Sequence, residues 1–263
     1  MKKYDLNDIF KSFKKIGLKR GDLIFLNSEL YKLGLFKDIK ESNIFDVFYK
    51  SLREVIGNSG TICLNTFTFN TLRKGEKFIY EDKKSTSGGF SNYILSKNNV
   101  IRSIHPVYSI SAIGPQAKEI CSNNSLNNFG YNSPYDKFVR LKGKVLNLGM
   151  DPWRNPYNHV AEFMIGVPYF YNKFTSVKYK QKGTNKKYTF STFVRYLDFN
   201  KIDDFSQLKK KLTKKKIIKK SKIGSGYIYL VNSKEYLDTC LELLSNNQFA
   251  LIKRKYYLEK SKN

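Results

Sequence analysis

Residues 143–169 read GKVLNLGMDPWRNPYNHVAEFMIGVPY and contain both kinds of element from which the fold is built. The first part, KVLNLGM (144–150), is a short apolar run typical of a buried strand. Asn155 and Pro156 then form a good start for a helix, and Gly166 suits its end. This stretch therefore predicts a strand followed directly by a helix.

Strand-like and helix-like segments alternate along the rest of the chain. Apolar residues at helical spacing predict helices, and short apolar or alternating runs predict strands. The predicted helices lie within 6–16, 44–56, 90–95 and 237–244, and the predicted strands are 21–27, 60–69, 107–114 and 226–231. This alternation favours a layered α/β domain.

One region departs from the alternation. Residues 172–222 hold many Lys and Tyr side chains and include the dense basic run KKKLTKKKIIKKSK (209–222). We predict that this region is an elaboration on the main domain. Because no Gly/Ser-rich or Pro-rich linker separates two parts, we expect residues 1–263 to form a single domain.

The composition favours a packed globule. Hydrophobic residues make up 41% of the 263 residues and aromatic residues 15%. No apolar run of 18 or more residues is present, and the N-terminus lacks the apolar core of a secretory signal, so we expect no membrane span and a cytoplasmic location. Cys63, Cys121 and Cys240 lie far apart, which is typical of free buried thiols in a reducing compartment.

The charge is strongly positive. The chain has 48 basic and 22 acidic residues, a formal net charge of +26, and most of the basic residues are Lys. Such an excess is either a solvated surface produced by residue usage or the footprint of a polyanionic partner. The aromatic residues fall at core spacing and do not interleave with Lys, so we expect no nucleic-acid partner; a basic nucleic-acid-binding protein remains the alternative.

His159 and Glu162 are the candidate catalytic residues that the pattern itself indicates. The chain has only two histidines, and His159 stands three residues before Glu162 on the predicted helix. At that spacing the two side chains share one helix face, and the carboxylate can fix the imidazole tautomer for general-base chemistry. The alternative is an ordinary surface pair. A zinc site is not expected, because only one other His and no paired Cys are present.

Seven stretches, taken in order, resemble the aminoglycoside 3-N-acetyltransferase family, whose members move acetyl from acetyl-CoA to an amino group on a sugar. The stretches are GDLIFLNSELYKLG (21–34), GNSGTICLNTFTF (57–69), STSGGFSNYIL (85–95), RSIHPVYSISAIGPQA (102–117), FGYNSPYDKF (129–138), residues 143–169 quoted above, and GSGYIYLVNSKEYLDTCLELLSNNQFAL (224–251). Both histidines, His105 and His159, fall inside these stretches.

The resemblance implies a layered α/β/α domain with a central mixed sheet, in which residues 172–222 form an elaboration on the acceptor side. It implies an acyltransferase that uses acetyl-CoA as cosubstrate and no metal. His159 would be the general base and Glu162 its partner. The coenzyme would contact Ser28, Arg102, Ser103 and Ser109. Independently, the small-residue loop that contains Ser85 and Gly88 precedes a predicted helix and could bind phosphate through backbone N–H groups.

The chain departs from the family pattern beside the base. Many relatives carry His where Asn27 stands, and relatives usually carry Thr where Pro156 and Tyr157 stand. That Thr is a candidate donor to the oxyanion. Tyr157, a candidate substrate-binding residue, could supply a hydroxyl in its place, and the sequence leaves this open. His105 can be either a structural or a chemical residue.

Of these predictions, the identity of the acceptor follows least directly from the sequence. Aminoglycosides are polycations that need acidic pockets, for which Glu81 and Asp82 are candidates. The net charge instead leans toward an anionic acceptor, so we hypothesise a nucleotide-linked amino sugar destined for a surface polysaccharide. Acetylation of aminoglycosides, which confers antibiotic resistance, is the alternative. The oligomeric state stays open.

Overall fold

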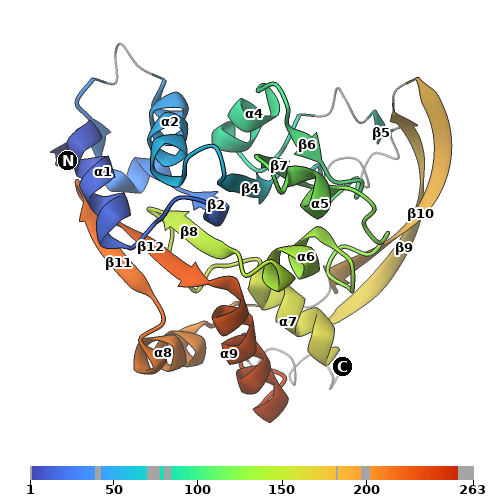
Figure 1. The fold of residues 1–263 in the computed structure, drawn as a ribbon. Helices are drawn as coiled ribbons and strands as arrows, with labels where there is room; N and C mark the ends of the chain where they lie inside the picture. The colour runs from blue at the N-terminus through green and yellow to red at the C-terminus, as the bar shows by residue number, and fades with distance from the viewer. Residues whose placement is uncertain are drawn as a thin grey trace.

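A seven-stranded mixed sheet forms the centre of the protein. The computed structural model describes residues 2–38, 43–69, 78–79, 84–181, 183–196 and 202–253. The strands lie in the order β11 (Lys219–Ile223), β12 (Gly226–Asn232), β8 (Lys144–Leu148), β2 (Leu23–Ser28), β4 (Thr61–Asn65), β7 (Ile110–Ile113) and β6 (Ile101–Arg102), as Figure 1 shows. β2 runs parallel to both β4 and β8, whereas the outer pairs are antiparallel. The predicted mixed sheet is confirmed.

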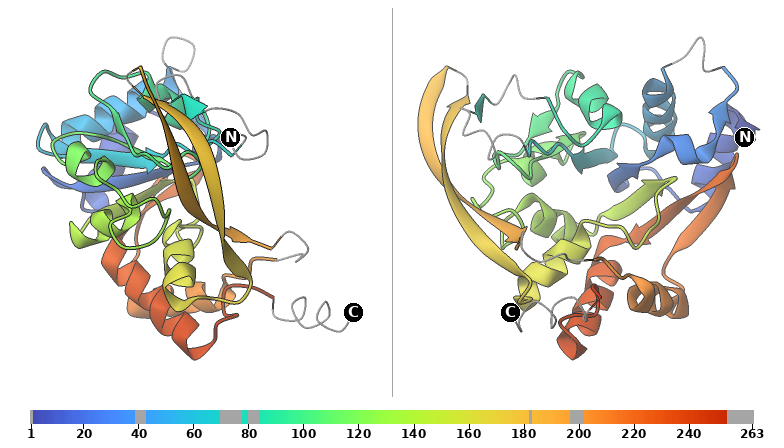
Figure 2. Two further views of the ribbon diagram at one scale, coloured as in Figure 1. Left: turned by 90° about the vertical axis from the view of Figure 1, so that its right-hand side faces the viewer. Right: turned by 180° about the vertical axis from the view of Figure 1, so that it is seen from behind.

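Helices cover both faces of this sheet (Figures 1 and 2). One face carries α1 (Leu6–Lys15), α2 (Ile44–Ile56) and α4 (Gly89–Leu95); the other carries α5 (Ala117–Cys121), α6 (Pro134–Arg140), α7 (Tyr157–Ile165) and α9 (Ser233–Asn246). β2 contributes to both cores, because Ile24 and Leu26 point to the first face while Leu23 and Phe25 point to the second. Residues 23–26 of the strand are all apolar since they are buried on both faces. The predicted α/β/α layering is confirmed.

The helix boundaries follow from local capping. Asp5 and Asp8 form a reciprocal capping box at the start of α1. Asn43 accepts a bond from the Phe45 N–H at the start of α2, and Gly57 ends that helix. The predicted strand at 60–69 is shorter than expected, because its ladder ends at Asn65. Beyond Asn65 the backbone still bonds to the segment before β7, because the Thr66 N–H donates to the Ser109 carbonyl and the Thr68 N–H to the Val107 carbonyl.

The region 172–222 is not one separate elaboration. Its first part is a long hairpin of β9 (Phe170–Gln181) and β10 (Thr184–Arg195), with β5 (Phe78–Ile79) beside β9, and this hairpin extends away from the main sheet in Figures 1 and 2. Its last part is integral, since α8 (Ser206–Lys215) packs on α9 and β11 is an edge strand of the central sheet. The smaller elements β1 (Lys3–Tyr4), β3 (Leu35–Phe36) and η1 (Leu30–Leu33) complete the N-terminal side. No helix in the described ranges has the length and apolarity needed to cross a membrane.

Phe25 lies at the centre of the core between the sheet and α6 and α7. It is fully buried, and its ring centroid lies 5.8 Å from Tyr135, 5.5 Å from Phe138 and 6.2 Å from Tyr157. We predict that Phe25→Ala lowers the free energy of unfolding by about 3–5 kcal/mol, because the cavity cannot fully collapse. Phe174→Ala, at a side chain that is 71% exposed, is the matched control and should change it by less than about 0.5 kcal/mol. Denaturant unfolding measures both, and equal effects would contradict this packing.

Candidate active site

The structure brings His159 and Glu162 into direct contact. Asn155 accepts a bond from the Tyr157 N–H at 3.1 Å at the start of α7, and Gly166 ends the helix in the left-handed conformation. Within this short helix His159 Nδ1 lies 2.6 Å from Glu162 Oε2. The Glu162 side chain is 1% exposed, whereas the His159 side chain is 42% exposed. The predicted pairing is therefore observed, with the carboxylate inside and the imidazole at a surface.

Glu162 is held from a second side as well. The Tyr169 hydroxyl donates to Glu162 Oε1 at 2.9 Å. Burial and the neighbouring carboxylate raise the pKa of Tyr169, so its hydroxyl remains a donor. With its Nδ1–H donated to the carboxylate, the neutral imidazole carries its lone pair on Nε2. That nitrogen is the atom able to accept a proton.

Aromatic rings position the imidazole. The His159 ring centroid lies 6.0 Å from Phe129 and 5.6 Å from Phe170, and Phe170 stacks on Phe193 at 4.8 Å. Phe170 lies at the start of β9 and Phe193 near the end of the paired strand β10. The base of the long hairpin therefore packs against the imidazole.

His159 opens into a cavity of about 440 Å³ at the carboxyl ends of the central strands. Ligand sites in open α/β sheets lie at this edge. The lining is largely aromatic, with Asp203 and Arg154 as its charged side chains among the described residues. The lining residues are Asn27, Asn65, Phe67, Phe69, Tyr108, Phe129, Tyr135, Met150, Arg154, Asn155, Pro156, Asn158, His159, Asp203 and Phe205.

Two further cavities continue this one into a long cleft. A cavity of about 260 Å³ shares Asn27, Asn65, Phe67 and Met150 with the His159 cavity. An apolar cavity of about 410 Å³ in turn shares Ser28, Ser87 and Phe90 with the middle one. The three cavities therefore connect an outer apolar slot with the base.

The residues predicted to bind the coenzyme separate into two groups. Ser28 lines both the middle and the outer cavity, and Gly88 lines the outer one, so both can touch a ligand in the cleft. Gly88 has a φ of +111°, a conformation that suits glycine. Ser85 instead builds the loop itself, because its hydroxyl donates to the Phe67 carbonyl and accepts from the Ser87 N–H.

Arg102, Ser103 and Ser109 are buried and hydrogen-bonded within the fold, and their contact with the coenzyme stays a prediction. They are 5%, 0% and 0% exposed. Arg102 Nε donates to the Ser109 hydroxyl at 2.9 Å, and the Ser103 hydroxyl accepts from the Ile110 N–H at 2.9 Å. Their polar atoms tie β6 and β7 together, and none of the three lines the cleft.

Tyr157, a candidate substrate-binding residue, lies in the core. It is fully buried against Phe25 and Phe138, and it does not line the cavity. Its hydroxyl has no hydrogen-bond partner among the described residues. The side chain follows the core face of α7 because His159 takes the cavity face. The predicted acidic residues Glu81 and Asp82 lie outside the described residues.

His105 is structural in this arrangement. Its Nδ1 accepts bonds from the Val107 N–H at 3.2 Å and the Tyr108 N–H at 3.1 Å, and its Nε2 lies 3.4 Å from the Ser191 carbonyl. Complete burial lowers the pKa of His105 to about 4. The neutral ring therefore joins the turn before β7 to strand β10.

The three cysteines lie apart from the cleft. Cys63, Cys121 and Cys240 are buried and free, and burial raises the pKa of each thiol. Within the described ranges no cluster of His, Cys, Asp or Glu could hold a metal ion. The chemistry of the cleft therefore centres on His159.

Sequence reasoning missed Asn65 and Tyr135, which line the same cavity as His159. The Tyr135 hydroxyl donates to Asn65 Oδ1 at 2.6 Å. The sequence indicates one of the two, because Asn65, like Asn27, is a polar residue at the carboxyl end of an apolar strand.

The fold and the site together define an α/β protein with a His–Glu pair beside a cavity at the carboxyl edge of a mixed sheet. Comparison with known proteins identifies the family more closely. Residues 27–245 match the family described as aminoglycoside 3-N-acetyltransferase. The chain belongs to this family, as the resemblance predicted.

The relatives share moderate identity over part of their length. Aminoglycoside N(3)-acetyltransferase III from Enterobacter cloacae is 25% identical over 178 residues, which are 61% of this chain and 60% of the relative. Aminoglycoside N(3)-acetyltransferase IV from Salmonella is 29% identical over 151 residues, 57% of this chain and 54% of the relative. The matched segments thus span just over half the length of these curated relatives.

Solved structures show the same fold over nearly the whole chain. Aminoglycoside acetyltransferase AAC(3)-Xa matches with a TM-score of 0.79 at 17% identity, covering 93% of each chain. The binary structure of AAC-IIIb with CoASH matches with a TM-score of 0.77 at 18% identity, covering 93% of this chain and 97% of that one.

The burial of His105 predicts a pH-dependent stability. The pKa of His105 in the folded protein is about 4, below its ordinary value of 6.5. The stability that the neutral, buried His105 contributes is therefore complete above pH 6.5 and is lost as the pH falls toward 4. Between pH 7 and pH 5 we expect the wild type to lose about 2 kcal/mol of unfolding free energy that His105→Asn does not lose. Asn can keep an acceptor near the Val107 N–H. Unfolding curves at both pH values test this, and parallel losses in the two proteins would contradict it.

Proposed function

We propose that this protein is an acetyl-CoA-dependent N-acetyltransferase that acetylates an amino group of an aminoglycoside by direct transfer. The observation that carries the proposal is the His159–Glu162 pair, open to a long cleft, in a chain that belongs to this family. The proposal includes no acyl-enzyme on a cysteine, because the three cysteines are buried and their thiols hold their protons.

His159 would act as the general base. An amine is a nucleophile only when neutral, and it must lose a proton as its nitrogen bonds to the thioester carbon. Nε2 of His159 would take this proton, directly or through one water, while Glu162 stabilises the imidazolium that forms. As the carbon–sulfur bond breaks, the imidazolium would return the proton to the departing thiolate, which leaves as CoA.

The cleft fits acetyl-CoA in shape and character. The outer cavity is apolar, with Leu30, Phe45 and Phe90 in its lining, and it leads past Ser28 and Ser87 toward His159. The pantetheine arm of the coenzyme, an extended chain with amide groups, can follow such a path. Holding both substrates in one cleft makes the attack effectively intramolecular.

The acceptor proposal follows the comparisons. Neighbouring structures include AAC-VIa bound to sisomicin and a mutant of AAC(3)-IVa in complex with a gentamicin. In this chain Asp203 lines the His159 cavity together with aromatic rings such as Phe69 and Tyr108, and carboxylates and aromatic faces both attract ammonium groups. A nucleotide-linked amino sugar, which the net charge favours, has Arg154 as its favourable contact in the same lining.

Acetyl transfer should depend on the His159–Glu162 pair. We expect His159→Ala to lower kcat by about 10²- to 10⁴-fold, because a positioned base contributes that much. Glu162→Gln should lower kcat by about 10- to 100-fold, since it weakens the group that orients the base. Met164→Ala, at an exposed residue of the same helix, is the control and should keep wild-type kcat. Thiol release from acetyl-CoA reports all three, and full activity in His159→Ala would refute the proposed base.

The choice of acceptor can be measured in the same assay. We expect kcat/KM for kanamycin- or gentamicin-type aminoglycosides to exceed that for UDP- or dTDP-linked amino sugars by at least about tenfold, a difference of about 1.4 kcal/mol in transition-state binding. Glucosamine, a free amino sugar with one amine, serves as the matched reference for charge. The reverse order would favour the nucleotide-linked acceptor and leave the transfer chemistry intact.

A further inference from the structure

Four residues stand where the middle cavity meets the His159 cavity. Asn27, Asn65, Phe67 and Met150 line both cavities, and only Asn27 and Asn65 among them have polar side chains. If the coenzyme follows the cleft and the base waits in the inner cavity, the thioester carbonyl lies at this junction. These two amides are therefore the side chains of the junction that can hydrogen-bond to that carbonyl.

The two amides are fixed in opposite senses. Asn27 uses its donor, because its Nδ2 donates to Asn147 Oδ1 at 2.9 Å in the buried interior. Asn65 uses its acceptor, because the Tyr135 hydroxyl donates to Asn65 Oδ1 at 2.6 Å. Asn27 thus presents its carbonyl oxygen to the junction, whereas Asn65 presents its NH₂ group. Among the described residues none accepts a bond from Asn65 Nδ2.

The backbone of Asn65 holds the side chain in one place. Asn65 is the last residue of β4, where it pairs with Ile110 of β7. Its carbonyl also accepts a bond from the Ser91 hydroxyl at 2.7 Å. A donor on the end of a strand is positioned more rigidly than one on a loop, which is what charge stabilisation in a transition state requires.

Tyr135 is held just as firmly. It is fully buried, it stacks on Phe25 at 5.8 Å and lies 5.2 Å from Phe129. Burial raises the pKa of Tyr135 well above its ordinary value, so the phenol stays a donor. It therefore fixes which end of the Asn65 amide faces the cleft.

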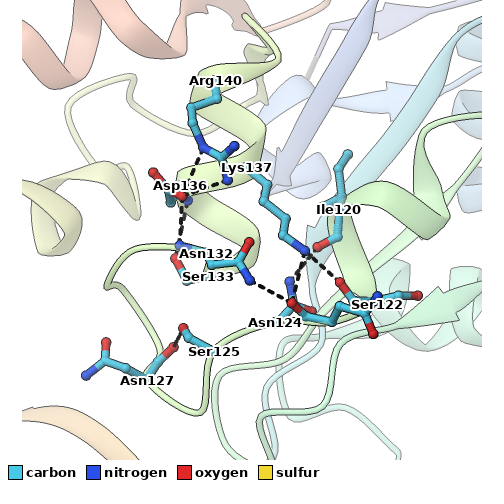
Figure 3. A network of polar contacts seen from close by, with 11 residues as sticks. Ile120, Ser122, Asn124, Ser125, Asn127, Asn132, Ser133, Asp136, Lys137 and Arg140 are labelled. Carbon is cyan, nitrogen blue, oxygen red and sulfur yellow. Dashed lines mark hydrogen bonds and ion pairs between the residues drawn. The ribbon is translucent and has the colours of Figure 1, made fainter.

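A network of polar contacts anchors the helix that carries Tyr135 (Figure 3). Lys137 Nζ donates to the Ser122 carbonyl at 2.6 Å, and the Asn132 N–H donates to Asp136 Oδ2 at 2.8 Å. Asp136 is in turn paired with Arg140 at 3.0 Å. These bonds tie the start of α6 to the preceding loop and so determine where the Tyr135 hydroxyl lies.

We propose that Asn65 is a catalytic residue whose Nδ2–H donates to the acetyl carbonyl oxygen as it becomes an oxyanion, and that Tyr135 is the positioning residue that orients this amide. This inference rests on the proposed acetyl transfer and adds the missing donor to it, since the Tyr157 hydroxyl is buried in the core. In the step concerned, the amine nitrogen bonds to the carbonyl carbon and the carbonyl π electrons move to oxygen. Asn65 stabilises that oxygen until the electrons return and the carbon–sulfur bond breaks.

The test separates this role from binding and from folding. We expect Asn65→Ala and Asn65→Asp to lower kcat by about 10²- to 10³-fold, the usual effect of losing one oxyanion donor, while KM for acetyl-CoA changes less than about threefold. Tyr135→Phe keeps the ring and its packing and should lower kcat by about tenfold. Asn185→Ala, at an exposed residue of β10, is the matched control and should keep wild-type kcat.

A spectroscopic readout reports the hydrogen bond itself. Acetyl-CoA is labelled with ¹³C at the acetyl carbonyl, and the infrared band of that carbonyl is recorded for the bound coenzyme. The band should lie at a lower wavenumber in wild type than in Asn65→Ala, because a hydrogen-bond donor weakens the carbonyl bond. Tyr135→Phe should give an intermediate band. If Asn65→Ala does not fold, Asn65→Asp and Tyr135→Phe carry the same comparison.

The outcomes distinguish this inference from the function on which it rests. One outcome is that transfer depends on His159 while Asn65→Ala keeps kcat within about twofold of wild type. That outcome would overturn the role of Asn65 and leave the proposed transfer intact. A rise in KM for acetyl-CoA with unchanged kcat would also overturn it, because it would show a contact made equally in the ground state. If wild type releases no thiol with any amine, the proposed transfer is wrong. If the carbonyl band is then also the same in wild type and in Asn65→Ala, the hydrogen bond from Asn65 is wrong as well.

Discussion

The contact of 2.6 Å between His159 Nδ1 and Glu162 Oε2 is the constraint on which the site depends. A carboxylate that is 1% exposed is costly to bury unless its oxygens are hydrogen-bonded. The imidazole and the Tyr169 hydroxyl supply these bonds from opposite sides. The backbone carbonyl of Glu162 is also used, because it accepts from both the Gly166 and the Val167 N–H groups. The end of α7 and the His159–Glu162 pair are therefore one structure: the left-handed turn at Gly166 brings Tyr169 back to Glu162.

The sheet explains why this helix end meets a cleft. β2 is the central strand, and the chain reaches its two parallel neighbours, β4 and β8, on opposite sides. Connections that leave a strand in opposite directions open a crevice at its carboxyl end. Asn27 and Ser28 lie at that end of β2, and Asn65 lies at that end of β4. The polar groups of the cleft are thus placed by the strand order, and α7, the next helix after β8, adds His159.

The parts that local chemistry determines could be predicted from the sequence. The start and end residues of the His159 helix, Asn155 and Gly166, lie close together in the chain, and the buried strands are continuous apolar runs because both of their faces are covered. The hairpin of β9 and β10 is much harder to predict, since much of it is polar and exposed and so lacks a hydrophobic period. The spacing of His159 and Glu162 alone does not show that Tyr157, on the same helix, is buried in the core. The bond between Tyr135 and Asn65 joins residues 70 positions apart, so no local pattern could show it.

The charge of the chain is a separate matter from its site. The basic run at 209–222 lies on α8 and β11, where Lys211 and Lys215 both pair with Glu242. β11 is an edge strand, and charged side chains along an edge discourage pairing with another chain. This part of the basic excess therefore has a structural reason that makes no reference to a ligand. In the proposed reaction the acceptor meets the lining of the His159 cavity, whose described residues include one carboxylate, one guanidinium and a series of aromatic rings. Many of the basic residues lie far from that lining. The net charge of the whole chain is therefore no reason to expect an anionic acceptor.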